Sequence, residues 1–102
     1  MCSIEIEPWY SGESLCKYLE AGNRFDLIFL DIELLKLSGI HVGNYIRNYL
    51  DDLKTSIIYI SYNRSYAMRL FKIQPLDFLV KPLQYNSVRE SVEMFLKRAG
   101  RK

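Results

Sequence analysis

The apolar and polar positions of this chain fall into blocks that predict strands and helices in alternation. Three short apolar runs, rich in branched and aromatic side chains, occupy residues 25–30, 56–60 and 76–80. Continuous runs of this length are typical of parallel strands that are buried on both faces. Residues 3–9 instead alternate between isoleucine and glutamate, which predicts a fourth strand with one exposed face near the edge of the sheet.

Segments with helical spacing separate and follow these strands. The first helix is expected from Glu13 to about Ala21, with Ser11 as its N-cap and Gly22 as its C-terminal stop. Three further helices are expected: one from Ile40, with Val42, Ile46, Tyr49, Leu50 and Leu53 on its apolar stripe; a shorter one from about Ser65 to Lys72, burying Ala67, Leu70 and Phe71; and a last one, capped by Ser87 and Glu90, with Val88, Val92, Phe95, Leu96 and Ala99 inward. This alternation predicts an α/β fold, a parallel sheet with right-handed crossovers and helices on both faces.

Composition narrows the class of protein. With 102 residues, 49% of them hydrophobic and 25% charged, the chain has the size and balance of one globular domain. Its net charge of +2 is too small to suggest that this segment binds nucleic acid. No apolar run approaches the roughly 20 residues that span a bilayer, so no membrane contact is expected. Cys2 and Cys16 have neither metal-site nor disulfide-framework spacing, which predicts a reduced, cytoplasmic setting.

Three consecutive strands are followed by polar side chains that can act together. Asp31, Ser61 and Lys81 each come at the carboxyl end of a predicted parallel strand, and these ends meet at one edge of the sheet. Taken singly, each residue is more often a turn former, a cap or a solvated charge. Together they supply a carboxylate nucleophile, a hydroxyl and a cation, which suits an anionic group attached to Asp31. Pro82 makes a cis peptide bond possible, which would hold Lys81 toward this site.

The same segments resemble the receiver domain of two-component response regulators, a flavodoxin-like fold. Among receivers, the chain looks most like those that precede LytTR-type DNA-binding domains. The resemblance covers essentially the whole chain and is carried by Phe-Asp-Leu-Ile-Phe-Leu-Asp at 25–31, Gly39-Ile40, Ile46-Arg47, Ile58-Tyr59-Ile60-Ser61, Ala67, Leu70-Phe71 and Asp77-Phe78-Leu79-Val80-Lys81-Pro82.

The resemblance implies a role for five positions. It makes Asp31 the phosphoacceptor, Ser61 the hydroxyl that contacts the phosphoryl group and Lys81 the phosphate-binding lysine. The backbone carbonyl of Glu33 would be a ligand of Mg²⁺, together with the Asp31 carboxylate. Phe78 would be the aromatic switch that responds to the Ser61 hydroxyl.

Receivers begin with a further strand and a first helix. That strand ends in an acidic pair that holds Mg²⁺. Position 1 falls just before the family's second strand, so residues 1–102 are expected to form an incomplete receiver domain of about four strands and four helices that lacks the acidic pair. Glu5 and Glu7 alternate outward and do not replace it, so Mg²⁺ binding and phosphorylation are expected to be weak or absent. Without the missing strand, the strand over residues 25–30 would keep an unpaired edge. Either the strand over residues 3–9 shifts to pair with it, or two chains exchange or share strands across the gap, and in both cases a homodimer is expected.

Two functions of different classes follow. The first is a phosphoacceptor receiver, not an enzyme, that takes its phosphoryl group from a sensor histidine kinase and controls transcription through a separate DNA-binding domain. The alternative is a pseudo-receiver, an interaction module that keeps the fold and is not phosphorylated. A phosphatase or hydrolase is a distant third, because no second acid or base is present to activate water.

Overall fold

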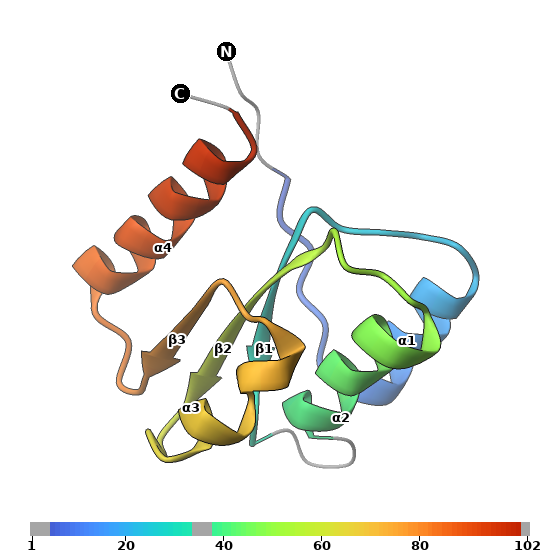
Figure 1. Ribbon diagram of the computed structural model, residues 1–102, viewed down its shortest axis with the longest axis horizontal. Helices are drawn as coiled ribbons and strands as arrows, with labels where there is room; N and C mark the ends of the chain where they lie inside the picture. Colours follow the sequence, from blue (N-terminus) through green and yellow to red (C-terminus); the bar gives the residue numbers. More distant parts are fainter. Residues whose placement is uncertain (1–4, 34–37, 101–102) are drawn as a thin grey trace.

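Three parallel strands form the sheet of this computed structural model, which describes residues 5–33 and 38–100. They are β1 (Leu27–Asp31), β2 (Ser56–Ser61) and β3 (Asp77–Val80), in the spatial order β1-β2-β3. In the register of the ladders, Phe29 lies beside Ile58, and Ser61 lies beside Val80. All three strands point the same way, so their carboxyl ends share one edge, as the sequence predicts (Figure 1).

The prediction of an edge strand over residues 3–9 is wrong for the residues of it that the structure describes. Residues 5–9 form no strand and make no backbone hydrogen bond to β1, while residues 3 and 4 lie outside the described part. An extended segment becomes a strand only by pairing with a neighbour. Residues 5–9 are instead held by side-chain packing. The centre of the Trp9 ring lies 4.9 Å from the centre of the Tyr18 ring and 6.4 Å from that of the Phe25 ring.

Helices cover both faces of the sheet, as predicted. Figure 1 shows the sheet between α1 (Gly12–Glu20) and α2 (Gly39–Asn44) on one side and α4 (Tyr85–Arg98) on the other. The side chain of Ser11 caps α1 by accepting a hydrogen bond from the Ser14 N–H. The N-cap of α4 is Gln84, whose side chain makes no capping hydrogen bond, so the capping box predicted farther along is wrong. None of the helices in the described ranges is long and apolar enough to cross a membrane.

The second predicted helix changes its winding partway. After α2 the chain forms a π-helical turn, η1 (Tyr45–Tyr49), closed by a hydrogen bond from the Leu50 N–H to the Tyr45 carbonyl. A π-turn holds an extra residue and rotates everything after it relative to an α-helix. Val42 before the π-turn and Ile46 near its start are buried as predicted, whereas Tyr49 at its end and Leu53 after it are exposed. Arg47 is turned into the protein instead.

The segment between β2 and β3 also departs from its predicted helix. It forms only α3 (Tyr66–Arg69) and a 3₁₀ turn, η2 (Phe71–Ile73). The tighter 3₁₀ winding keeps Leu70 buried but exposes Phe71, and Ile73 takes the buried position; Ala67 is also exposed.

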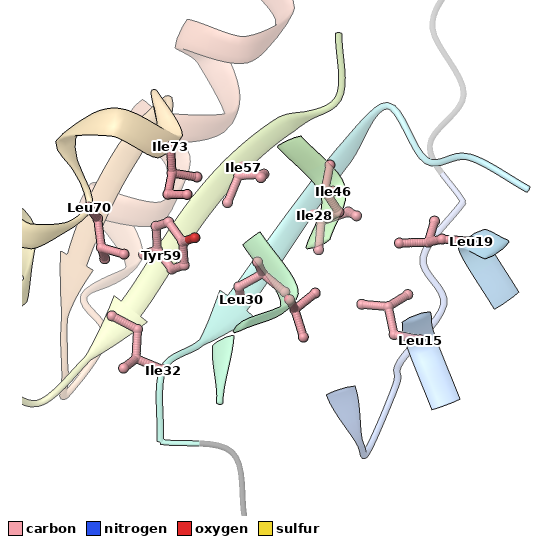
Figure 2. Packing of buried hydrophobic residues seen from close by; sticks show 11 residues of the cluster. Leu15, Leu19, Ile28, Leu30, Ile32, Ile46, Ile57, Tyr59, Leu70 and Ile73 are labelled. Carbon is pink, nitrogen blue, oxygen red and sulfur yellow. The ribbon is translucent and has the colours of Figure 1, made fainter. Parts of the chain in front are cut away.

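One face of the sheet carries the main core. In Figure 2, Leu15 and Leu19 of α1 point toward Ile28 and Leu30 of β1. The core on this face consists of Leu15, Leu19, Ile28, Leu30, Ile32, Val42, Ile46, Ile57, Tyr59, Leu70 and Ile73. The other face is only partly covered. Phe29 is 39% exposed there. Of the inward face predicted for the last helix, Val88, Val92, Phe95 and Leu96 are half-buried, whereas Ala99 is exposed. Burial of β1 on both faces was therefore predicted wrongly.

Candidate functional site

The site lies where the three strands end. Asp31 and Ser61 are the last residues of β1 and β2, and Lys81 follows β3 directly. Asp31 thus belongs to the strand, whereas the sequence suggested a position just past the strand's end. The Nζ atom of Lys81 is 2.6 Å from the Oδ2 atom of Asp31, a distance typical of a strong charge-assisted hydrogen bond. Two residues that are 50 positions apart therefore meet as an ion pair.

Ser61 is joined to this pair through the side chain of Glu33. The fully buried Ser61 hydroxyl donates to the Glu33 Oε2 atom at 2.5 Å and accepts from the Asn63 N–H at 3.0 Å. The Glu33 Oε1 atom accepts from the Tyr62 N–H at 3.2 Å and lies 3.5 Å from the Lys81 Nζ atom. Sequence reasoning gave Glu33 a role only for its main chain and missed its carboxylate. Its only sequence signal was an acidic residue two positions after Asp31.

Lys81 is held between opposite charges. The hydrogen bond to Asp31, together with the negative charges of Asp31 and Glu33, raises the pKa of Lys81 above its ordinary value. Lys81 therefore carries its positive charge throughout the neutral pH range. The ammonium also lies 4.7 Å from the centre of the Tyr62 ring, a cation–π contact. Tyr62 was missed by the sequence reasoning because no pattern pointed to it.

The remaining predicted positions lie on or beside β3. Phe78 is half-buried, packs against the core and lies beside Tyr59 in the ladder, two positions before Ser61. The Lys81–Pro82 peptide bond is cis.

A metal ion has few ligands here. Within residues 5–33 and 38–100, no group of three or more His, Cys, Asp or Glu side chains could hold one. Both carboxylate oxygens of Asp31 already accept hydrogen bonds, from the Lys81 ammonium and the Glu33 N–H. Glu5 and Glu7 are exposed. The described residues by themselves therefore do not fit Mg²⁺, which prefers six oxygen ligands.

Relatives with this sequence pattern are response regulators. The model of the response regulator receiver domain matches residues 2–93. The sensory transduction protein LytT of Oceanobacillus iheyensis is 36% identical over 72 residues, which cover 71% of this chain and 29% of that protein. The transcriptional regulatory protein LytR of Staphylococcus aureus is 29% identical over 89 residues, 85% of this chain and 35% of that protein. The chain thus spans about a third of the length of these curated relatives.

Solved structures agree with the fold. The signal receiver domain of a putative Luxo repressor protein from Vibrio parahaemolyticus superposes with a TM-score of 0.75 at 30% identity, covering 90% of this chain and 70% of that one. The response regulator protein TrrA from Thermotoga maritima, in complex with Mg²⁺-BeF, gives 0.72 at 30% identity, covering 90% and 77%. Receiver domains are signalling modules that interact with histidine kinases, often dimerise and generally bind Mg²⁺. The flavodoxin-like fold is confirmed, and this chain belongs to the response regulator receiver domain family, with relatives of the LytR and LytT type.

Proposed function

We propose that Asp31 accepts a phosphoryl group from a sensor histidine kinase. One observation carries this proposal: the Asp31 carboxylate lies 2.6 Å from a lysine ammonium, at an edge of the sheet where Ser61 and the Tyr62 N–H supply further hydrogen-bond donors. The Asp31 side chain is 39% exposed, so a donor can reach it from solvent.

The transfer is a substitution at phosphorus. A lone pair of an Asp31 carboxylate oxygen forms the new O–P bond, while the P–N bond of a phosphohistidine breaks and leaves its electron pair on the imidazole nitrogen. The product is an acyl phosphate. Lys81 offsets the repulsion between the incoming phosphoryl group and the carboxylate, because it stays protonated beside Asp31.

The response to modification involves Ser61 and Phe78. The phosphoryl group adds a charge of about −1.5 to −2 near the carboxyl ends of the strands. A hydrogen bond from the Ser61 hydroxyl to that group would draw Ser61 toward Asp31 and change the space next to Phe78. The surface formed by β3, α3 and α4 would then change its affinity for a partner.

Magnesium is a weak point of the site. The described residues include no group of three or more side chains that could hold a metal ion, and Glu33 adds a second negative charge beside Asp31. For this chain we propose weak Mg²⁺ binding and slow phosphorylation. The same two observations support the alternative, a pseudo-receiver that binds partners without being phosphorylated.

The proposal extends to the protein's context. Residues 1–102 would act as one receiver unit without enzymatic activity of its own, and a separate DNA-binding domain would carry control of transcription. The name of LytR as a transcriptional regulatory protein supports this output, and the net charge of +2 gives this segment little attraction for nucleic acid. The cytoplasmic setting stays a prediction.

A homodimer is supported by the open edge of β1. Hydrogen bonds to β2 use alternate residues, such as the Asp26 carbonyl and the Ile32 N–H. The residues between them, Leu27, Phe29 and Asp31, direct their backbone groups away from β2, and these groups have no partner within the described ranges. A Phe29→Lys variant should weaken the dimer in sedimentation equilibrium, and a wild-type chain that is monomeric at micromolar concentration would remove the idea.

Phosphorylation is tested with acetyl phosphate and Mg²⁺, followed by intact-mass spectrometry. The wild-type chain should gain one phosphoryl group slowly and in only part of the population, and Asp31→Asn should gain none. Asp51→Asn is the matched control, because it removes an exposed carboxylate far from the site at a positive φ of 55°, which asparagine tolerates. An unmodified wild-type chain would favour the pseudo-receiver, and a modified Asp31→Asn chain would refute the role of Asp31.

A further inference from the structure

The Glu33 carboxylate uses the hydrogen-bond donors that surround Asp31. One of its oxygens takes the Ser61 hydroxyl at 2.5 Å, and the other takes the Tyr62 N–H at 3.2 Å and faces the Lys81 ammonium at 3.5 Å. A carboxylate thus holds a hydroxyl, a backbone N–H and a cation at once. These donors come from two different strand ends, and Glu33 is the acceptor common to them.

A phosphoryl group on Asp31 would need the same donors. Its three terminal oxygens accept hydrogen bonds and carry negative charge. The Lys81 ammonium already donates to one carboxylate oxygen of Asp31. The other described donors at this edge, from Ser61 and Tyr62, are engaged by Glu33.

We infer that the Glu33 side chain is a built-in competitor of the phosphoryl group: its carboxylate occupies the donors of Ser61, Tyr62 and Lys81 until Asp31 is modified. This inference rests on the proposed function of Asp31. In the unmodified chain Glu33 stands where the phosphoryl oxygens would be, and it repels an anionic phosphodonor. Modification requires it to swing away and release the Ser61 hydroxyl.

The position of Glu33 makes this exchange feasible. Its side chain is 36% exposed and lies in the turn that follows β1, so it can rotate into water without disturbing the core. Its backbone N–H, which donates to the Asp31 Oδ1 atom at 2.9 Å, can stay in place while the carboxylate leaves. The competitor is therefore tethered to the residue that it protects.

Replacing Glu33 tests the inference. The rate of modification by acetyl phosphate with Mg²⁺ should rise about tenfold in Glu33→Ala, the factor expected for one charge-assisted hydrogen bond released per transfer. Glu33→Gln keeps an acceptor oxygen but loses the charge, so its rate should fall between those of Glu33→Ala and the wild type. Glu13→Gln, which removes an exposed carboxylate of α1, should leave the rate unchanged.

A second readout does not depend on the transfer itself. Inorganic phosphate is titrated into ¹⁵N-labelled chains while the amide signal of Tyr62 is followed by NMR. Glu33→Ala should bind phosphate about tenfold more tightly than the wild type, because the Tyr62 N–H and the Ser61 hydroxyl are then free.

The outcomes separate the two proposals. If the wild-type chain is modified at Asp31 and Glu33→Ala reacts at an equal or lower rate, the role of Asp31 as phosphoacceptor stands and the role of Glu33 as competitor is refuted. A lower rate would mean that the Glu33 carboxylate assists the reaction, for example by attracting the metal. If no variant is modified, the phosphoacceptor fails, and the phosphate titration decides on Glu33. Equal phosphate affinity in Glu33→Ala and the wild type would then overturn the competitor as well.

Discussion

The contact between Gly43 and Tyr59 gives the sharpest test of the fold. Tyr59 is fully buried on β2, and its hydroxyl has no hydrogen-bond partner within the described part of the chain. Gly43 of α2 makes room for that hydroxyl. A Cβ atom at Gly43 would lie 1.8 Å from the Tyr59 hydroxyl oxygen and 3.0 Å from its Cζ atom, far inside ordinary contact.

The magnitude follows from two opposing terms. An alanine at Gly43 gains about 1 kcal/mol of helix propensity over glycine. The clash costs more, because the Tyr59 ring is enclosed and overpacking of a filled core costs about 1–3 kcal/mol or somewhat more. Gly43→Ala should therefore lower the free energy of unfolding by about 2 kcal/mol. Tyr59→Phe should raise it by about 1 kcal/mol, because it removes a buried hydroxyl without a partner.

A double-mutant cycle checks this explanation. Urea unfolding followed by circular dichroism gives the free energy of unfolding of each variant. Tyr59→Phe should relieve most of the clash, so the coupling energy between positions 43 and 59 should be about 1–2 kcal/mol. Gly22→Ala is the matched control: its φ of +103° strains an alanine, but a Cβ atom there meets nothing within 4 Å, so Tyr59→Phe should not rescue it. A Gly43→Ala chain as stable as the wild type, or one that Tyr59→Phe leaves equally impaired, would refute the reasoning.

Three further predictions concern polar groups. Arg47 is 7% exposed and donates from Nε and Nη1 to two backbone carbonyls at 2.7 and 2.9 Å, so Arg47→Ala should destabilise the fold by about 2–4 kcal/mol in the same urea assay. Burial alone would raise the pKa of Asp52, but hydrogen bonds from Thr55 outweigh it and hold that pKa below 3.8. The ionised Asp52 carboxylate therefore stabilises the fold at pH values above 3.8, and this stabilisation is lost as the pH falls through the lowered pKa. In a plot of Tm against pH, Asp52→Asn should flatten the fall on the acid side. The hydrogen bond to Asp31 raises the pKa of Lys81 above 10.5, so its stabilisation is present below pH 10.5 and is lost as the pH rises through the raised value. Lys81→Met should flatten the alkaline limb, and an unchanged limb would contradict the ion pair.

Local pattern was enough for the three strands of the sheet and their common direction. The apolar runs that became β1, β2 and β3 are continuous, and short parallel strands need little more than such a run with a helix after it. The same reasoning placed Asp31 and Lys81 at one edge, because parallel strands share an end. The spacing rule was weaker for helices. Tyr49 was expected inside because an α-helix was assumed, and a single π-turn moved it to the surface.

Sequence alone therefore determined the parallel α/β fold and the placement of Asp31, Ser61 and Lys81 at one edge of the sheet, because both depend on local periodicity and on chain direction. Tertiary structure decided what those residues contact. That Glu33 lies between Ser61 and Lys81 depends on how the turn after β1 is held against the next strand, across 28 positions of sequence. The strand expected at residues 5–9 depended in the same way on a neighbour, since a strand gains its backbone hydrogen bonds only from another strand.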